Sequence, residues 1–182
     1  MASGKEEALR LLEEGNKLHR DGNIDGAIDC YRRSLEAHPT ADAYTYLGWM
    51  LSFKGEIDEA IALCKSAIEV DPEFGNPYND IGVYLMQQGK LDEAEPWFRR
   101  ATLAKRYEPR HFPHINLARI RIARHRYSEA IPHLAMGLQL APGDPTAGNL
   151  LREIAAKLNG SLGTLPLEFQ KLFADKDDKE DK

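Results

Sequence analysis

A seven-residue motif recurs along the chain and constrains the fold more than any other feature. Its copies occupy residues 22–28, 55–61, 89–95 and 125–131, at spacings of 33, 34 and 36 residues. Three copies begin with glycine, the last begins with His125, and all four carry an alanine at the sixth place. A period of this length is typical of solenoids, in which each repeat is one small supersecondary unit. The sequence therefore predicts a stack of repeats.

The residues of each period favour a hairpin of two helices. The leading glycines Gly22, Gly55 and Gly89 suit the left-handed residue that ends a helix, and His125 takes that conformation at some cost. Apolar residues recur at helical spacing, as in the segment 57–68. A hairpin of this kind cannot bury its apolar face alone, so neighbours must stack. Small residues stand where the paired helices must cross, namely Gly15, Gly48, Gly82, Ala118, Ala27, Ala60, Ala94 and Ala130.

With these positions the chain resembles the tetratricopeptide repeat family over residues 8–159. The second copy carries Tyr44, Leu47, Gly48, Ala60, Cys64 and Pro72, and the third carries Tyr78, Ile81, Gly82, Ala94 and Phe98. The resemblance implies an all-α fold, a right-handed superhelical solenoid of four helix-turn-helix repeats with a C-terminal capping helix. The predicted repeats are 8–40, 41–74, 75–110 and 111–144, and the capping helix is 145–158.

Two positions depart from the family pattern. Arg106 stands where the third repeat should have its closing proline, and this repeat has two extra residues, so we expect a longer second helix or an altered turn. Arg121 stands where the fourth repeat should carry a large apolar residue. We expect either a shifted register or an arginine whose charged end reaches water.

The C-terminal part divides into a cap and a tail. Leu150, Leu151, Ile154 and Leu158 form one apolar stripe of the capping helix, and an open solenoid end needs such a helix. We expect residues 160–182 to form a tail, in which 165–173 has the apolar spacing of a short helix and the acidic end is disordered. Three interpretations of 165–173 stay open: a helix packed on the cap, a disordered segment, or a motif that docks in a groove of this chain or of a partner.

Composition excludes several classes of protein. A net charge of −5 over 182 residues argues against a dedicated nucleic-acid binder. The two cysteines, Cys30 and Cys64, are too few for a disulfide scaffold and fall where buried thiols act as small apolar groups. We expect no signal peptide, and no apolar run is long enough to span a membrane. We therefore expect a cytoplasmic protein.

The resemblance implies that the first helix of each repeat lines a concave face that binds ligands. Tyr46, Trp49 and Phe53 lie beyond the core aromatic Tyr44 of the same helix, and aromatic anchors are typical of interface hot spots. The alternative is that Trp49 and Phe53 pack against the next repeat. The candidate peptide- or partner-binding residues are Asn16, Tyr46, Trp49, Phe53, Asn79, Asp80, Met86, Asn116 and Arg119.

One known ligand class of the family can be weighed directly. Receptors for the acidic C-terminal tails of chaperones use a two-carboxylate clamp of lysine, asparagine and arginine. Asp80 would repel a carboxylate where that clamp needs a cation, and only Asn16 fits. At the five clamp positions this chain carries Leu12, Asn16, Tyr46, Asn76 and Asp80. A co-chaperone role is therefore disfavoured.

The other groups of charged and polar residues give little support for metal binding or catalysis. Residues 105–126 hold seven Lys or Arg and one acid, which is compatible with a solvated basic face, an acidic protein partner or nucleic acid. His111 and His114 have a metal-compatible spacing, but Pro113 separates them and no further ligand is near in sequence. No nucleophile–base pair or phosphate loop appears. We expect no enzyme activity, no cofactor, no metal and no nucleic-acid or membrane partner.

The sequence thus predicts a non-catalytic adaptor that holds a protein or peptide partner, such as a helix, in a concave groove. The main alternative is a self-associating structural scaffold, although we expect a monomer rather than a homo-oligomer. An autonomous stacking unit without a ligand also stays open. Fold alone does not name the partner.

Overall fold

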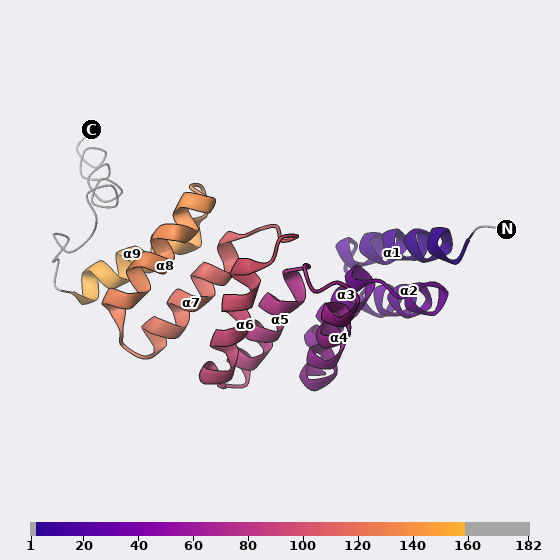
Figure 1. The fold of residues 1–182 in the computed structure, drawn as a ribbon, viewed down its shortest axis with the longest axis horizontal. Coiled ribbons are helices and arrows are strands. Elements are labelled where there is room, and N and C mark those ends of the chain that lie inside the picture. The colour runs from indigo at the N-terminus through magenta and orange to yellow at the C-terminus, as the bar shows by residue number, and fades with distance from the viewer. Residues whose placement is uncertain (1–2, 159–182) are drawn as a thin grey trace. The chain divides into compact units, whose positions relative to one another are not determined.

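The computed structural model describes residues 3–158, and in that range the chain is helical apart from its turns and one isolated bridge between two extended residues. Successive helices pair as antiparallel hairpins (Figure 1). The all-α repeat fold predicted from the sequence is confirmed. The helices are α1 (Gly4–Arg20), α2 (Ile24–Ala37), α3 (Ala41–Phe53), α4 (Ile57–Val70), α5 (Asn76–Gln87), α6 (Leu91–Leu103), α7 (His111–Ala123), α8 (Tyr127–Leu140) and α9 (Pro145–Lys157).

Helix starts follow from local capping. The first helix begins at Gly4, before the predicted start of the repeats, because Ser3 and Glu6 form a reciprocal capping box. Asn23 and Thr40 cap α2 and α3 by accepting a hydrogen bond from the third residue beyond each.

The turn inside each hairpin has the predicted left-handed residue. Gly22, Gly55 and Gly89 have φ of 80°, 81° and 76°. His125 has φ of 57° at the corresponding place in the fourth repeat, and its ring Nδ1 lies 3.0 Å from the hydroxyl of Tyr127. The register of the fourth hairpin is therefore that of the others.

Small residues allow the paired helices to cross closely, as predicted. In the third hairpin a Cβ placed on Gly82 of α5 would lie 2.6 Å from the ring of Phe98 on α6. Gly15 of α1 stands in the same relation to Tyr31 of α2. The buried thiols Cys30 and Cys64 lie in this packing, and burial raises the pKa of both. Four small residues of the second helices are fully buried: Ala27, Ala60, Ala94 and Ala130.

The end of the third repeat is an altered turn and not a longer helix. Helix α6 stops at Leu103, and the chain then runs back alongside the α4–α5 turn. The amide of Arg106 donates to the carbonyl of Glu73 at 2.9 Å, and the amide of Gly75 donates to the carbonyl of Arg106 at 2.9 Å. These two hydrogen bonds form a parallel bridge between Phe74 and Arg106. The bridge joins the third repeat to the turn that ends the second.

Within the described residues, 3–108 and 109–158 belong to two separate compact units. The predicted superhelix spans both units and stays a prediction. In the second unit, Asp144 caps α9 through two backbone amides. The predicted stripe of α9 belongs to a core shared with α7 and α8. The predicted tail, 160–182, lies outside the described residues.

The expectation for Arg121 is wrong in both of its forms. The register is unchanged, and the side chain does not reach water, since Arg121 is only 7% exposed. Its Nε lies 3.5 Å from a carboxylate oxygen of Glu129 on α8. A buried guanidinium is tolerated here because an acid of the paired helix faces it.

Candidate functional site

An exposed aromatic cluster lies on α1 and α3, which are the first helices of the first two repeats. Trp49 is 40% exposed and Phe53 is 58% exposed, although both are large apolar side chains. Their ring centroids are 5.7 Å apart, and the ring of His19 on α1 packs edge-on to Trp49 at 4.6 Å. The two residues therefore contact the preceding repeat and stay open to water. We call His19, Trp49 and Phe53 the aromatic cluster.

Tyr46 and Asn16 are tied into the fold more than the sequence suggested. Tyr46 is half-buried, and its ring packs 5.8 Å from that of Tyr31. Asn16 accepts a hydrogen bond from the Tyr31 hydroxyl at 2.8 Å. Both residues stabilise the first hairpin, so substitution of either would confound a binding experiment.

The candidate residues of α5 differ in accessibility. Asn79 is buried and donates to a carboxylate oxygen of Asp80 at 3.4 Å, whereas Met86 is half-buried. Burial raises the pKa of Asp80 to about 7, against the smaller effect of the Asn79 hydrogen bond, which lowers it. Asp80 is therefore a carboxyl that changes charge near neutral pH.

Asp80→Asn should make the protein less sensitive to pH. Because the native pKa of Asp80 is about 7 and its ordinary value is 3.8, the native state holds a proton that the unfolded state loses as pH rises through that window. The contribution of Asp80 to stability is thus present below pH 4 and lost by pH 7–8. We expect Asp80→Asn to exceed wild type by about 4 kcal/mol in unfolding free energy at pH 8 and to match it closely at pH 4.

Urea denaturation at pH 4, 6 and 8 measures this difference. Asp21→Asn, at an exposed carboxyl that ends α1, is the matched control and should show no such trend. An Asp80→Asn variant that is less stable than wild type at pH 8 would show that the Asp80 charge is stabilising.

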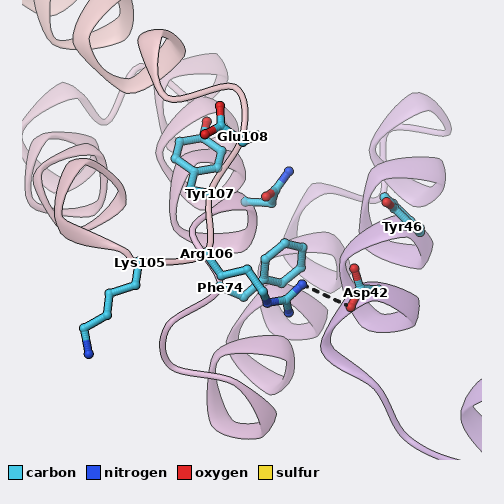
Figure 2. A pocket seen from close by; sticks show the side chains of 8 residues that line it. Asp42, Tyr46, Phe74, Lys105, Arg106, Tyr107 and Glu108 are labelled. Atoms are coloured by element: carbon cyan, nitrogen blue, oxygen red, sulfur yellow. Dashed lines mark ion pairs between the residues drawn. The ribbon is translucent and has the colours of Figure 1, made fainter. Parts of the chain in front are cut away.

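A polar pocket opens within the first unit at the beginning of α3 and α5. Its volume is about 420 Å³. Asp42 and Tyr46 line it from α3, and Tyr107 and Glu108 line it from the segment after α6 (Figure 2). We call it the α3–α5 pocket. Its lining residues are Asp42, Tyr46, Phe74, Asn76, Lys105, Arg106, Tyr107 and Glu108.

Arg106 connects the segments that surround this pocket. Its guanidinium donates to Asp71 at 2.7 Å, approaches Asp42 at 3.6 Å and lies 3.9 Å from the ring centre of Phe74. The hydrogen bonds from Arg106 lower the pKa of the Asp71 carboxyl. Lys105 pairs with Glu73 at 2.9 Å, and its side chain extends away from the other lining residues in Figure 2.

The candidate residues of the fourth repeat lie in the second unit. Asn116 is buried and accepts a hydrogen bond from exposed Arg119 at 3.2 Å. His111 faces Asp144 at 3.5 Å, and His114 lies near His133. Among residues 3–158 no three potential ligands gather as a metal site would require.

The basic stretch 105–126 is largely occupied by internal pairs. Lys105, Arg106, Arg121 and Arg126 each contact an acid within their own unit. A continuous basic surface for an acidic partner or for nucleic acid stays untested. These ion pairs argue against it, because they partly neutralise the basic side chains.

Sequence reasoning missed part of the site. Neither Asp42 nor Glu108 belongs to a recognisable sequence motif. Tyr107 lies in the segment where the third repeat departs from the family pattern. The two extra residues before α7 were a signal for altered structure, but not for a pocket. That pocket depends on contacts between residues some 35 positions apart in sequence, such as Asp71 and Arg106.

Family models for the tetratricopeptide repeat match residues 41–74 and 78–103, which cover α3–α4 and most of α5–α6. The chain is a tetratricopeptide repeat protein. Repeats of this family generally mediate protein–protein interactions and are generally not catalytic. None of the helices within 3–158 combines the length and apolar character needed to cross a bilayer.

Curated tetratricopeptide proteins are similar over part of their length. "Small glutamine-rich tetratricopeptide repeat-containing protein 2" of Mycosarcoma maydis is 33% identical over 88 residues, which are 48% of this chain and 25% of that protein. The human "RNA polymerase II-associated protein 3" is 29% identical over 117 residues, 61% of this chain and 16% of its own. The chain thus matches a quarter or less of these two relatives.

Solved tetratricopeptide structures share the fold. Pseudomonas aeruginosa pilF has a TM-score of 0.83 at 20% identity, over 96% of this chain and 78% of that one. The second repeat domain of Spaghetti (RPAP3), bound to the HSP90 peptide SRMEEVD, has a TM-score of 0.53 at 25% identity, over 56% of this chain and 94% of that one.

Proposed function

We propose that this chain is a non-catalytic adaptor that binds an extended peptide or a partner helix on the first helices of its repeats. The observation that carries the proposal is the aromatic cluster, in which Trp49 and Phe53 stay exposed while the rest of α3 is well packed. Exposed aromatic side chains that already contact one another lose little side-chain entropy on binding and give large buried areas. They are typical anchors of an interface.

A double variant tests the role of the aromatic cluster. We expect Trp49→Ala/Phe53→Ala to weaken binding of selected peptides at least tenfold, because each truncated aromatic anchor costs about 2 kcal/mol or more. The ligands are peptides selected by display on the wild-type protein, and the measurement is fluorescence anisotropy. The thermal unfolding midpoint should change little, since both side chains are exposed.

The matched control is Leu103→Ala, which removes a side chain that is 82% exposed on a second helix. It should bind like wild type. Unchanged peptide binding in the double variant would contradict the proposal. A large loss of stability in the double variant would show that the cluster serves folding.

A chaperone-tail ligand is the second candidate, and the likeness to the Spaghetti domain bound to SRMEEVD favours it. Charge opposes it, because Asp80 lies at a place where the clamp needs a cation, and Asp42 lines the neighbouring pocket. Binding of SRMEEVD that persists in Asp80→Asn and increases there would support this candidate.

Self-association is the structural alternative. Leu103 and Val70, at the ends of α6 and α4, are large exposed apolar residues that a second copy could cover. Light scattering over a range of concentrations distinguishes the two functions. A concentration-independent monomer mass supports the adaptor.

A further inference from the structure

The carboxyl of Asp80 on α5 carries an inference about the ligand, which rests on the proposed peptide-binding function. We propose that Asp80 binds the cationic group of an arginine or lysine in a peptide whose apolar residue lies on the aromatic cluster. Three observations support this assignment. The carboxyl has no cation of its own, the titratable groups around it are neutral, and the same face of α5 carries polar atoms without partners next to the helix of the cluster.

Asp80 is an acid that no cation of the described chain neutralises. Within residues 3–158 its carboxylate accepts one hydrogen bond, from the side-chain amide of Asn79 at 3.4 Å, and no lysine, arginine or histidine forms an ion pair with it. The side chain is half-buried and lies outside the lining of the α3–α5 pocket. A partly buried carboxylate is costly without a cation, because burial removes the water that would solvate its charge. A ligand cation would reduce that cost.

The titratable groups around Asp80 do not compensate its charge. They are Cys64 on α4, Tyr84 on α5 and Tyr107 in the segment after α6. Burial, and to a smaller extent the charge of Asp80, raise the pKa of each, so the thiol and both phenols are neutral at pH 7. Burial likewise raises the pKa of Asp80 to about 7. A bound cation would favour the ionised form and lower this pKa.

Two polar atoms without partners continue the face of α5 that carries Asp80. Tyr84 and Gln88 follow Asp80 at intervals of four residues, which places the three side chains in one row along the helix. The Tyr84 hydroxyl and the Oε1 of Gln88 are buried, and within the described residues neither has a hydrogen-bond partner. All three groups can accept a hydrogen bond, and an ammonium or guanidinium brings only donors. The row therefore suits a cation better than a carboxylate.

Ser52 connects this row to the aromatic cluster. Burial raises the pKa of Tyr84, and the neighbouring Ser52 of α3 opposes that effect, so the phenol lies beside this hydroxyl. The Ser52 hydroxyl donates its proton to the carbonyl of Trp49 at 2.7 Å and leaves the Tyr84 hydroxyl without a partner. Ser52 stands between Trp49 and Phe53 in the sequence of α3. One peptide can therefore contact the aromatic cluster and the row on α5 together.

Peptide arrays with one charged position test this inference. Each nine-residue peptide carries Phe at its centre, and arginine, its neutral isostere citrulline, or glutamate occupies each other position in turn. The remaining positions hold random neutral residues. At one or two positions we expect wild type at pH 8 to prefer arginine over citrulline about tenfold, because a hydrogen bond to a charged group is worth that ratio or more. Glutamate should be disfavoured at the same positions.

The variant Asp80→Asn locates the effect. It keeps the shape of the side chain and should be more stable than wild type at pH 8, so unfolding would not explain a lost preference. It should bind the citrulline peptides like wild type and lose most of the preference for arginine. The control Asp21→Asn removes an exposed carboxyl at the end of α1 and should keep the preference. An arginine preference of wild-type size in Asp80→Asn would overturn the assignment.

The preference for arginine should also depend on pH with a defined sign. The cation binds ionised Asp80, whose pKa in the free protein is about 7, so the preference should be large at pH 8 and small at pH 5. Wild type and Asp80→Asn share His19 and every other titratable group, so their difference isolates Asp80. Binding that strengthens as pH falls, in wild type alone, would contradict the assignment, because protonated Asp80 would then donate to a neutral acceptor of the ligand.

The outcomes separate this inference from the proposed function. Binding that requires Trp49 and Phe53 but does not distinguish arginine from citrulline, or that favours glutamate, overturns the assignment of Asp80 alone. An absence of binding by every peptide, or binding indifferent to Trp49 and Phe53, overturns the proposed function as well.

Discussion

Gly82→Ala should lower the free energy of unfolding by about 2–3 kcal/mol. Alanine in the middle of α5 would ordinarily stabilise the helix by about 1 kcal/mol relative to glycine. Here the added Cβ would meet three atoms of the Phe98 ring at 2.6–2.8 Å, and that ring is fully buried. The steric cost therefore exceeds the gain in helix propensity. Urea denaturation measures the result.

The matched control for Gly82 is Gly148→Ala in α9, where a Cβ meets nothing within 4 Å. This substitution should stabilise the protein by about 0.5–1 kcal/mol, opposite in sign to Gly82→Ala. The double variant Gly82→Ala/Phe98→Leu should lose less stability than the sum of the losses in the two single variants, because the smaller side chain relieves the contact. Full additivity would show that Phe98 is not the cause.

Gly75→Ala should have a comparable effect on stability, about 2–3 kcal/mol, and a larger effect on the site. The backbone of Gly75, with φ of −81°, is accessible to any residue, so conformational strain is not the reason. The added Cβ would lie 2.4 Å from the Cβ of Tyr107 and 3.0 Å from that of Ala104. These atoms are attached to the backbone, so the segment after α6 would have to move.

Hydrogen exchange at the amides of Gly75 and Arg106 measures the displacement, since both amides donate across the bridge. Both amides should exchange faster in Gly75→Ala than in wild type. Gly143→Ala, in the turn between α8 and α9, has open space around its Cβ and serves as the control. Protection of both amides at wild-type levels would contradict the predicted movement.

The parts predicted correctly from sequence depend on local signals. Glycine at a helix end, small residues at a crossing and an apolar stripe act through neighbours within one hairpin. The periodicity therefore indicated the hairpins, their turns and the stripe of α9. Trp49 and Phe53 could be singled out because they fall off the core stripe of their helix.

The parts predicted wrongly or missed depend on distant partners. Arg121 is buried because Glu129 of the next helix faces it. The general tendency of arginine to lie at the surface does not predict such a pair. The turn at Arg106 requires Asp71 and Phe74, some 30 residues earlier. The pocket follows from that turn, so its carboxylates could not be recognised as one group from sequence alone.

The bridge between Phe74 and Arg106 bears on how the array unfolds. In a linear array each repeat is stabilised by its own hairpin and by its nearest neighbours, and the weakest junction opens first. Two backbone hydrogen bonds and the Arg106 contacts strengthen the junction of the second and third repeats. Residues 41–108 should therefore unfold as one cooperative block. Local unfolding that starts at the N-terminus should involve α1 and α2 and should not extend into α3. The aromatic cluster straddles that boundary, since His19 is on α1 and Trp49 is on α3. A ligand bound there would also stabilise the N-terminal end of the array against local unfolding.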